Sequence, residues 1–109
     1  MAYDAELADR VRDALGARQN LTERKMFGGI GFMLSGNMAT GVIRDDLIIR
    51  LDPEEGERAL DEPGVRMFDL TGRPMTGWLL VGPEATASDE GLRAWVDRGA
   101  AFAESLPPK

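Results

Sequence analysis

The side chains that carry most enzyme chemistry are missing from this sequence. Its 109 residues include no histidine and no cysteine. The commonest general base, the commonest transition-metal ligand and the thiolate nucleophile are therefore all absent, which excludes Ser-His-Asp and Cys-His arrangements. We expect a protein that is not an enzyme, with no catalytic residue, no cofactor and no bound metal.

Two adjacent carboxylates, Asp45 and Asp46, are the main remaining candidates for chemistry. Carboxylate oxygens could hold Mg²⁺ or act as general acid and base. These two residues fall between predicted strands, where aspartate is favoured because its side chain can bond to the turn backbone. We interpret them as turn residues, and an enzyme that uses carboxylates and arginine is the least favoured functional class.

Glycines at positions 28, 29 and 31 form a G-x-G pattern, which is part of some nucleotide-binding loops. A third glycine at the required spacing is missing, and the segment leads into a strand instead of a helix. Glycines at the start of a strand instead permit a bulge or a close approach of two backbones. The pattern therefore indicates backbone geometry, with no phosphate site.

The net charge is −6, from 19 acidic and 13 basic residues, and the sequence pI is about 4.6. The summed field repels phosphate backbones, so unaided binding to duplex DNA is not expected. No apolar run is long enough to span a membrane, and the first residues lack the features of a signal peptide. We therefore expect a cytoplasmic protein that makes no membrane contact.

Hydrophobic spacing and turn residues predict one α+β domain over residues 1–109, built as a two-layer sandwich. Connections of about three residues join the first three predicted strands, which makes that part an antiparallel meander. The predicted elements are a helix ending near Gly16, strands at 30–34, 38–43 and 47–51, a helix from Pro53, strands at 65–68 and 78–81, and a helix from about 86–89 to 106.

Pairing the first two predicted strands places Leu34 opposite Met38, Phe32 opposite Thr40, and Ile30 opposite Val42. The other face then pairs Met33 with Ala39, and Gly31 with Gly41. Neither face is plainly polar, so we expect a helix layer or a second subunit to cover the second one. A homodimer is predicted on this basis.

Six segments of the sequence together form a recognisable pattern: Arg24-Lys25-Met26-Phe27-Gly28-Gly29-Ile30-Gly31-Phe32-Met33, Gly36-Asn37-Met38, Asp46-Leu47-Ile48-Ile49-Arg50-Leu51, Gly72-Arg73-Pro74-Met75, Gly77-Trp78 and Trp95-Val96. The pattern resembles the N-terminal domain of the TfoX/Sxy family over nearly the whole chain. The resemblance implies a secretion-chaperone-like sandwich. The best-known members regulate natural competence with the cyclic-AMP receptor protein and carry a second, helical domain, which we expect this stand-alone chain to lack.

Three cations in these segments, Arg24, Lys25 and Arg73, could form a patch for a phosphate, a carboxylate or an acidic partner. The alternative is ordinary surface pairing with the abundant acids. Methionines and a tryptophan could likewise line a binding groove or belong to the core; these are Met26, Met67, Met75 and Trp78. The candidate interaction residues are Arg24, Lys25, Phe27, Gly28, Gly29, Arg73 and Met75.

The sequence thus favours a non-enzymatic regulatory or protein-interaction module, linked to transcription regulation and acting through an unidentified protein partner. The alternative is a small-anion or RNA-binding domain that uses Arg24, Lys25 and Arg73, with RNA favoured over duplex DNA because of the acidic charge.

Overall fold

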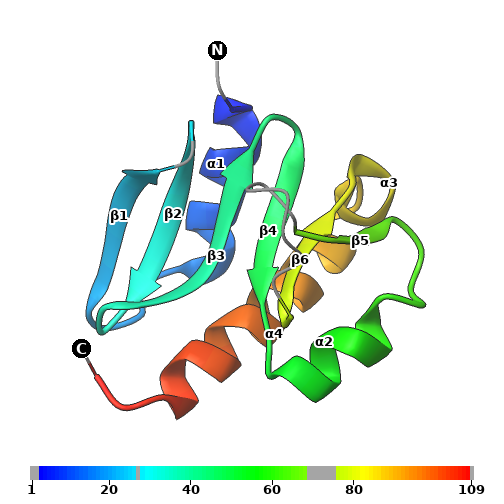
Figure 1. The fold of residues 1–109 in the computed structure, drawn as a ribbon. Coiled ribbons are helices and arrows are strands. Elements are labelled where there is room, and N and C mark those ends of the chain that lie inside the picture. Colours follow the sequence, from blue (N-terminus) through cyan, green and yellow to red (C-terminus); the bar gives the residue numbers. More distant parts are fainter. Residues whose placement is uncertain (1–2, 27, 69–75, 109) are drawn as a thin grey trace.

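A six-stranded antiparallel sheet, with helices packed on one face, makes up this protein (Figure 1). The computed structural model describes residues 3–26, 28–68 and 76–108. The predicted two-layer α+β architecture is confirmed, with an N-terminal helix, the sheet, and a C-terminal helix packed against it. No helix in the described part of the chain is long and apolar enough to cross a membrane.

The elements follow the predicted order, with one strand and one short helix added. In chain order they are α1 (Ala5–Leu15), β1 (Leu21–Met26), β2 (Gly29–Leu34), β3 (Asn37–Ile43), β4 (Asp46–Arg50), α2 (Pro53–Ala59), β5 (Val65–Met67), β6 (Trp78–Val81), α3 (Pro83–Thr86) and α4 (Asp89–Ser105).

Short polar side chains cap the three longer helices and fix where each begins. The Asp4 carboxylate accepts hydrogen bonds from two first-turn amides of α1. The Asp52 carboxylate accepts from one first-turn amide of α2, and the Ser88 hydroxyl accepts from one amide of α4. Each cap satisfies donors that have no partner inside the helix. These caps set the helix starts close to the predicted positions.

The strands lie in the order β1-β2-β3-β4-β6-β5, and every neighbouring pair is antiparallel. Three of the pairs expected between β2 and β3 are confirmed: Ile30–Val42, Gly31–Gly41 and Phe32–Thr40.

The expected pairs Leu34–Met38 and Met33–Ala39 are wrong. Leu34 instead pairs with Asn37, and Met33 pairs with Met38, because the register shifts between Phe32 and Met33. The shift leaves Ala39 as the extra residue of a β-bulge.

The sequence prediction missed β1 and α3. Four neighbouring residues of β1, from Thr22 to Lys25, are exposed, so no alternation of apolar and polar residues marks this strand. Pairing with β2 along six residues nevertheless holds it in the sheet. The sheet therefore has a charged outer strand that hydrophobic pattern alone does not reveal.

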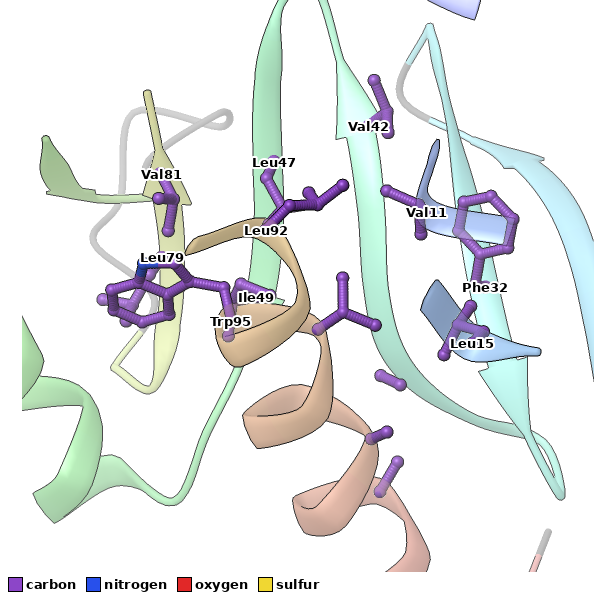
Figure 2. Close-up of a cluster of buried hydrophobic side chains, with 14 of the residues drawn as sticks. Val11, Leu15, Phe32, Val42, Leu47, Ile49, Leu79, Val81, Leu92 and Trp95 are labelled. Carbon is purple, nitrogen blue, oxygen red and sulfur yellow. The ribbon is translucent and has the colours of Figure 1, made fainter. Parts of the chain in front are cut away.

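The main core lies between the sheet and the helices (Figure 2). Val11 and Leu15 of α1 face Phe32 of β2, while Leu92 and Trp95 of α4 cover β4 and β6. Each of the four helices among the described residues contributes side chains to this core or packs against it. Gly99 lets α4 approach β3 closely, because a side-chain carbon there would collide with the Ala39 carbonyl oxygen.

A second hydrophobic cluster lies on the opposite face of the sheet. It contains no helix residue; its members are Met38, Ile43, Ile48, Phe68 and Leu80, with Met33 and Trp78 partly buried beside them. The five members are no more than 5% exposed in the single chain. The expected helix layer is absent from the described residues on this face, and a second subunit is not needed to bury the cluster. The prediction of a homodimer rested on the need to cover this face, and that reason no longer applies. The homodimer itself stays a prediction.

A hydrogen bond connects the segment after α4 to the start of β3, next to the turn that joins β2 and β3. The buried Asn37 side chain donates a hydrogen bond from Nδ2 to the Pro107 carbonyl at 2.9 Å. Figure 1 accordingly shows the C-terminal end of the described chain beside that turn and the first residues of β1.

Candidate functional site

The first strand, β1, forms one edge of the sheet and carries two of the predicted interaction residues, Arg24 and Lys25. Consecutive residues of a strand point to opposite faces. Lys25 is opposite Ile30 and therefore shares the helix-covered face, while Arg24 is opposite Gly31 and lies on the other face. One cation thus stands on each side of the same sheet edge.

Neither cation has a partner within the described part of the chain. Arg24 and Lys25 are exposed, and neither side chain makes a hydrogen bond or an ion pair there. By contrast, five other arginines besides Arg12 bind a carboxylate: Arg10, Arg18, Arg44, Arg66 and Arg98. Ordinary pairing with the abundant acids, the alternative raised by the composition, is therefore not seen for Arg24 and Lys25 among the described residues.

The neighbouring acid, Glu23, is already bound. Arg12 of α1 donates two hydrogen bonds to the Glu23 carboxylate, from Nε to Oε2 at 2.7 Å and from Nη2 to Oε1 at 2.9 Å. Hydrogen bonding and charge from Arg12 hold the pKa of Glu23 below its ordinary value and outweigh the opposing effect of partial burial. Glu23 is therefore not available to neutralise the adjacent Arg24 and Lys25.

An open groove of about 320 Å³ lies beside Arg24. Its lining combines polar and apolar groups: Thr22, Glu23, Arg24, Met33 and Gly36. Thr22 and Met33 are cross-strand partners on the same face as Arg24. A ligand held by Arg24 can therefore also contact a half-buried thioether and a hydroxyl group.

The backbone of β1 has hydrogen-bonding groups that face away from the sheet. The Ser35 amide donates to the Asn20 carbonyl at 3.0 Å, which marks this pair as hydrogen-bonded. Such pairs alternate along an antiparallel ladder, so Thr22 and Arg24 bond to β2 while the amides and carbonyls of Glu23 and Lys25 point outward. In the described part of the chain, no strand pairs with that outer side.

The two-residue turn after β2 supports this assignment. Ser35 and Gly36 both have positive φ, 51° and 84°, as in the type I′ turn of a tight hairpin. The flanking residues Leu34 and Asn37 then bond to each other, which directs the Leu34 backbone toward β3 and away from β1.

The predicted glycines have structural roles in the turn that joins β1 to β2. Gly28 has a φ of 77°, which glycine adopts without strain. Gly29 allows a close approach of β2 to β3, because a side-chain carbon there would collide with the Val42 carbonyl oxygen. This outcome agrees with the conformational interpretation of the glycine-rich segment. The other candidates, Phe27, Arg73 and Met75, lie outside the described residues.

The adjacent aspartates behave differently from each other. Asp45 is exposed, whereas the Asp46 side chain is only 7% exposed and binds Arg66 of β5 at 2.8 Å, with Arg44 at 3.8 Å. Among residues 3–26, 28–68 and 76–108, no three carboxylates gather closely enough to hold a metal ion. Asp46 is therefore an internal partner for arginine, a role that its place in the sequence did not reveal.

The environment of Arg50 was also missed. The Arg50 guanidinium lies 5.2 Å from the centre of the Trp78 ring and 5.5 Å from that of Phe102, and it makes no ion pair within the described residues. Phe102 comes from α4, more than fifty positions later in the chain, so no local pattern could identify this contact. Stacking against two rings anchors Arg50 between β4, β6 and α4.

Comparison with known proteins identifies one family. The model of the TfoX N-terminal domain matches residues 13–103, which include every strand and all of α4 except its last two residues. No curated protein and no solved structure matches the chain. With most of its length matched by that model, the chain belongs to the TfoX N-terminal domain family.

Proposed function

We propose that this domain is a non-enzymatic protein-interaction module that captures an extended, acidic segment of a partner protein along β1. The observation that carries the proposal is a pair of adjacent exposed cations, Arg24 and Lys25, on a sheet edge where neither the side chains nor the outer side of the strand has a partner among the described residues. Addition of a strand to a free edge is a common mode of peptide recognition, in which main-chain bonds supply affinity and side chains supply specificity.

The acidic net charge does not prevent this mode of binding. At physiological ionic strength, interactions between exposed charges fade beyond about 8 Å. An acidic residue in direct contact with Arg24 and Lys25 therefore responds mainly to these two cations and less to distant acids. Binding of this kind weakens as salt is added.

A regulatory role is part of the proposal. The resemblance to promoter-acting members of the family supports a partner from the transcription apparatus. The lack of histidine and cysteine in the sequence supports a mechanism based on binding alone. We expect the domain to act by occupying or presenting its partner, without chemical change to either protein.

The test measures binding of a short labelled peptide of threonine and valine with two central glutamates, by fluorescence anisotropy at low and physiological salt. The double variant Arg24→Glu/Lys25→Glu should weaken binding about tenfold or more, because two attractive contacts become repulsive. The control, Arg58→Glu/Arg93→Glu, changes two exposed helical arginines and alters the net charge equally. It should bind the peptide like the unmodified protein.

The same measurement with an oligouridine probe examines the small-anion and RNA alternative. The unpaired state of Arg24 and Lys25 also suits phosphate, so RNA binding that the β1 double variant abolishes would favour this alternative if the acidic peptide fails to bind. Equal peptide affinity in the β1 variant and in the control would exclude β1 as the binding site.

The predicted homodimer is a separate proposal. A second copy would bring another Arg24 and Lys25 to the edge, so we do not assign its interface to β1. Sedimentation at tens of micromolar decides the matter: the mass of one chain overturns the homodimer and leaves the β1 proposal intact.

A further inference from the structure

We infer that the partner segment carries two consecutive acidic residues, whose side chains lie on opposite faces of the extended sheet. This inference rests on the proposed function and specifies the ligand of the same edge. It follows from the positions of the two cations and from the direction of the free backbone groups.

The incoming strand takes its position from the outward amides and carbonyls of Glu23 and Lys25. Main-chain bonds to these two residues leave Arg24 opposite the partner residue that lies between the two bonded positions. The strand therefore places consecutive residues opposite Arg24 and Lys25, whichever way it runs.

Opposite residues of paired strands share a face and bring their side chains within about 5 Å of each other. The partner residue opposite Arg24 lies on the face of Gly31 and Gly41, beside the groove that contains Met33. The residue opposite Lys25 lies on the helix-covered face. An acid at each position meets one unpaired cation. A single acid could not reach both cations, because they lie on opposite faces of the sheet.

The position opposite Glu23 ends the acidic run on one side. The Glu23 carboxylate is held by two hydrogen bonds from Arg12, which also favour its ionised form by lowering its pKa. A third acid, opposite Glu23, would face this carboxylate, and like charges at opposite positions destabilise a strand pair. A neutral residue is expected there.

Two isomeric peptides test the arrangement directly. Both contain the same residues, but one has adjacent glutamates and the other has glutamates separated by one residue, which places both side chains on one face. The adjacent isomer should bind about two- to fivefold more tightly, because it gains a second cross-strand charge pair. The variants Arg24→Gln and Lys25→Gln should each reduce this preference, while Arg93→Gln should preserve it.

Amide hydrogen exchange gives a second measurement on the unmodified protein. Binding of the adjacent isomer should slow exchange of the Glu23 and Lys25 amides, whereas the Arg24 amide is already protected by β2 in the free protein. Unchanged exchange at Glu23 and Lys25 would overturn the strand-addition geometry.

The outcomes also separate this inference from the proposed function. Equal affinity of the two isomers overturns the consecutive-acid arrangement while the acidic-segment proposal survives. Failure of both isomers to bind overturns the proposed function itself.

Discussion

The two edge strands of the sheet, β5 and β1, differ in length and in how their cations are paired. The β5 edge is three residues long, and its arginine, Arg66, binds the nearly buried Asp46 at 2.8 Å. The β1 edge is six residues long, and its cations Arg24 and Lys25 bind nothing in the described part of the chain. Short strands and edge charges both discourage uncontrolled strand pairing. At the β5 edge an internal acid neutralises the cation, whereas no acid in the described residues binds the cations of the β1 edge. We propose that an acidic partner supplies the missing charge at β1.

The largest expected effect concerns the turn that holds β1 on the sheet. Gly29→Ala should lower the free energy of unfolding by on the order of 3 kcal/mol, because the added methyl group meets the Val42 carbonyl and forces β2 away from β3. Urea unfolding measures the loss. The control is Gly28→Ala, which strains an exposed residue of positive φ and should cost about 1 kcal/mol. Equal losses would contradict the close approach at Gly29.

The next effect tests which backbone groups of β1 face outward. Arg24→Pro should destabilise the protein by about 2 kcal/mol, because it removes an amide that bonds to β2 and leaves a carbonyl of buried Gly31 without its donor. Lys25→Pro removes an outward amide and should cost under about 1 kcal/mol. Each substitution removes one cation, so the charge change is the same in both variants. The difference between their thermal unfolding therefore reports the loss of the backbone hydrogen bond. A larger loss of stability for Lys25→Pro would mean that the Lys25 amide, and not the Arg24 amide, bonds to β2.

At the closed edge, Asp46→Asn should cost about 1 kcal/mol. The substitution removes the charge that holds Arg66, but Arg66 and Arg44 are more than half exposed and can be solvated by water. Asp45→Asn, in the same turn, should change stability by less than about 0.5 kcal/mol because Asp45 is exposed. Urea unfolding of the two variants compares them. Indistinguishable results would mean that the ion pair does not stabilise the β5 edge.

The smallest effect concerns the one acid of β1. Because the folded-state pKa of Glu23 is lowered, its pairing with Arg12 contributes stability above the ordinary glutamate pKa, near 4.3. That contribution is lost as the pH falls through the lowered folded value. Glu23→Gln should therefore cost a few tenths of a kcal/mol at pH 7 and progressively less in acid.

Urea unfolding at several pH values measures this difference, with Glu57→Gln on the exposed surface of α2 as the control. A Glu23→Gln cost that stays constant down to strongly acidic pH would contradict an electrostatic origin.

Much of the fold could be predicted because most elements carry their signal locally. The apolar stripes of α1 and α4, the helix-starting Asp52-Pro53 and the short turns between β2, β3 and β4 each depend on residues close in sequence. The bulge at Ala39 and the strand β1 depend on distant contacts. Ala39 meets Gly99 of α4, and β1 is held by β2 despite its charged residues.

The site was predictable only in part, for the same reason. Arg24 and Lys25 were identified through the resemblance to a family, but their lack of acidic partners could be known only after the acids had been placed. Arg12, which binds the Glu23 carboxylate, lies eleven positions earlier in the chain, on α1. The sequence shows an excess of acids, and only the fold shows that none of those in the described residues reaches these two cations.

The bond between Asn37 and the Pro107 carbonyl has a practical consequence for measurement. It keeps the chain's last described residues beside the turn next to the start of β1. A fluorophore or spin label attached after this point would begin close to the open edge. It could report the arrival of a peptide by energy transfer or relaxation without any change to β1, whereas a bulky purification tag in the same place would compete with the peptide for space.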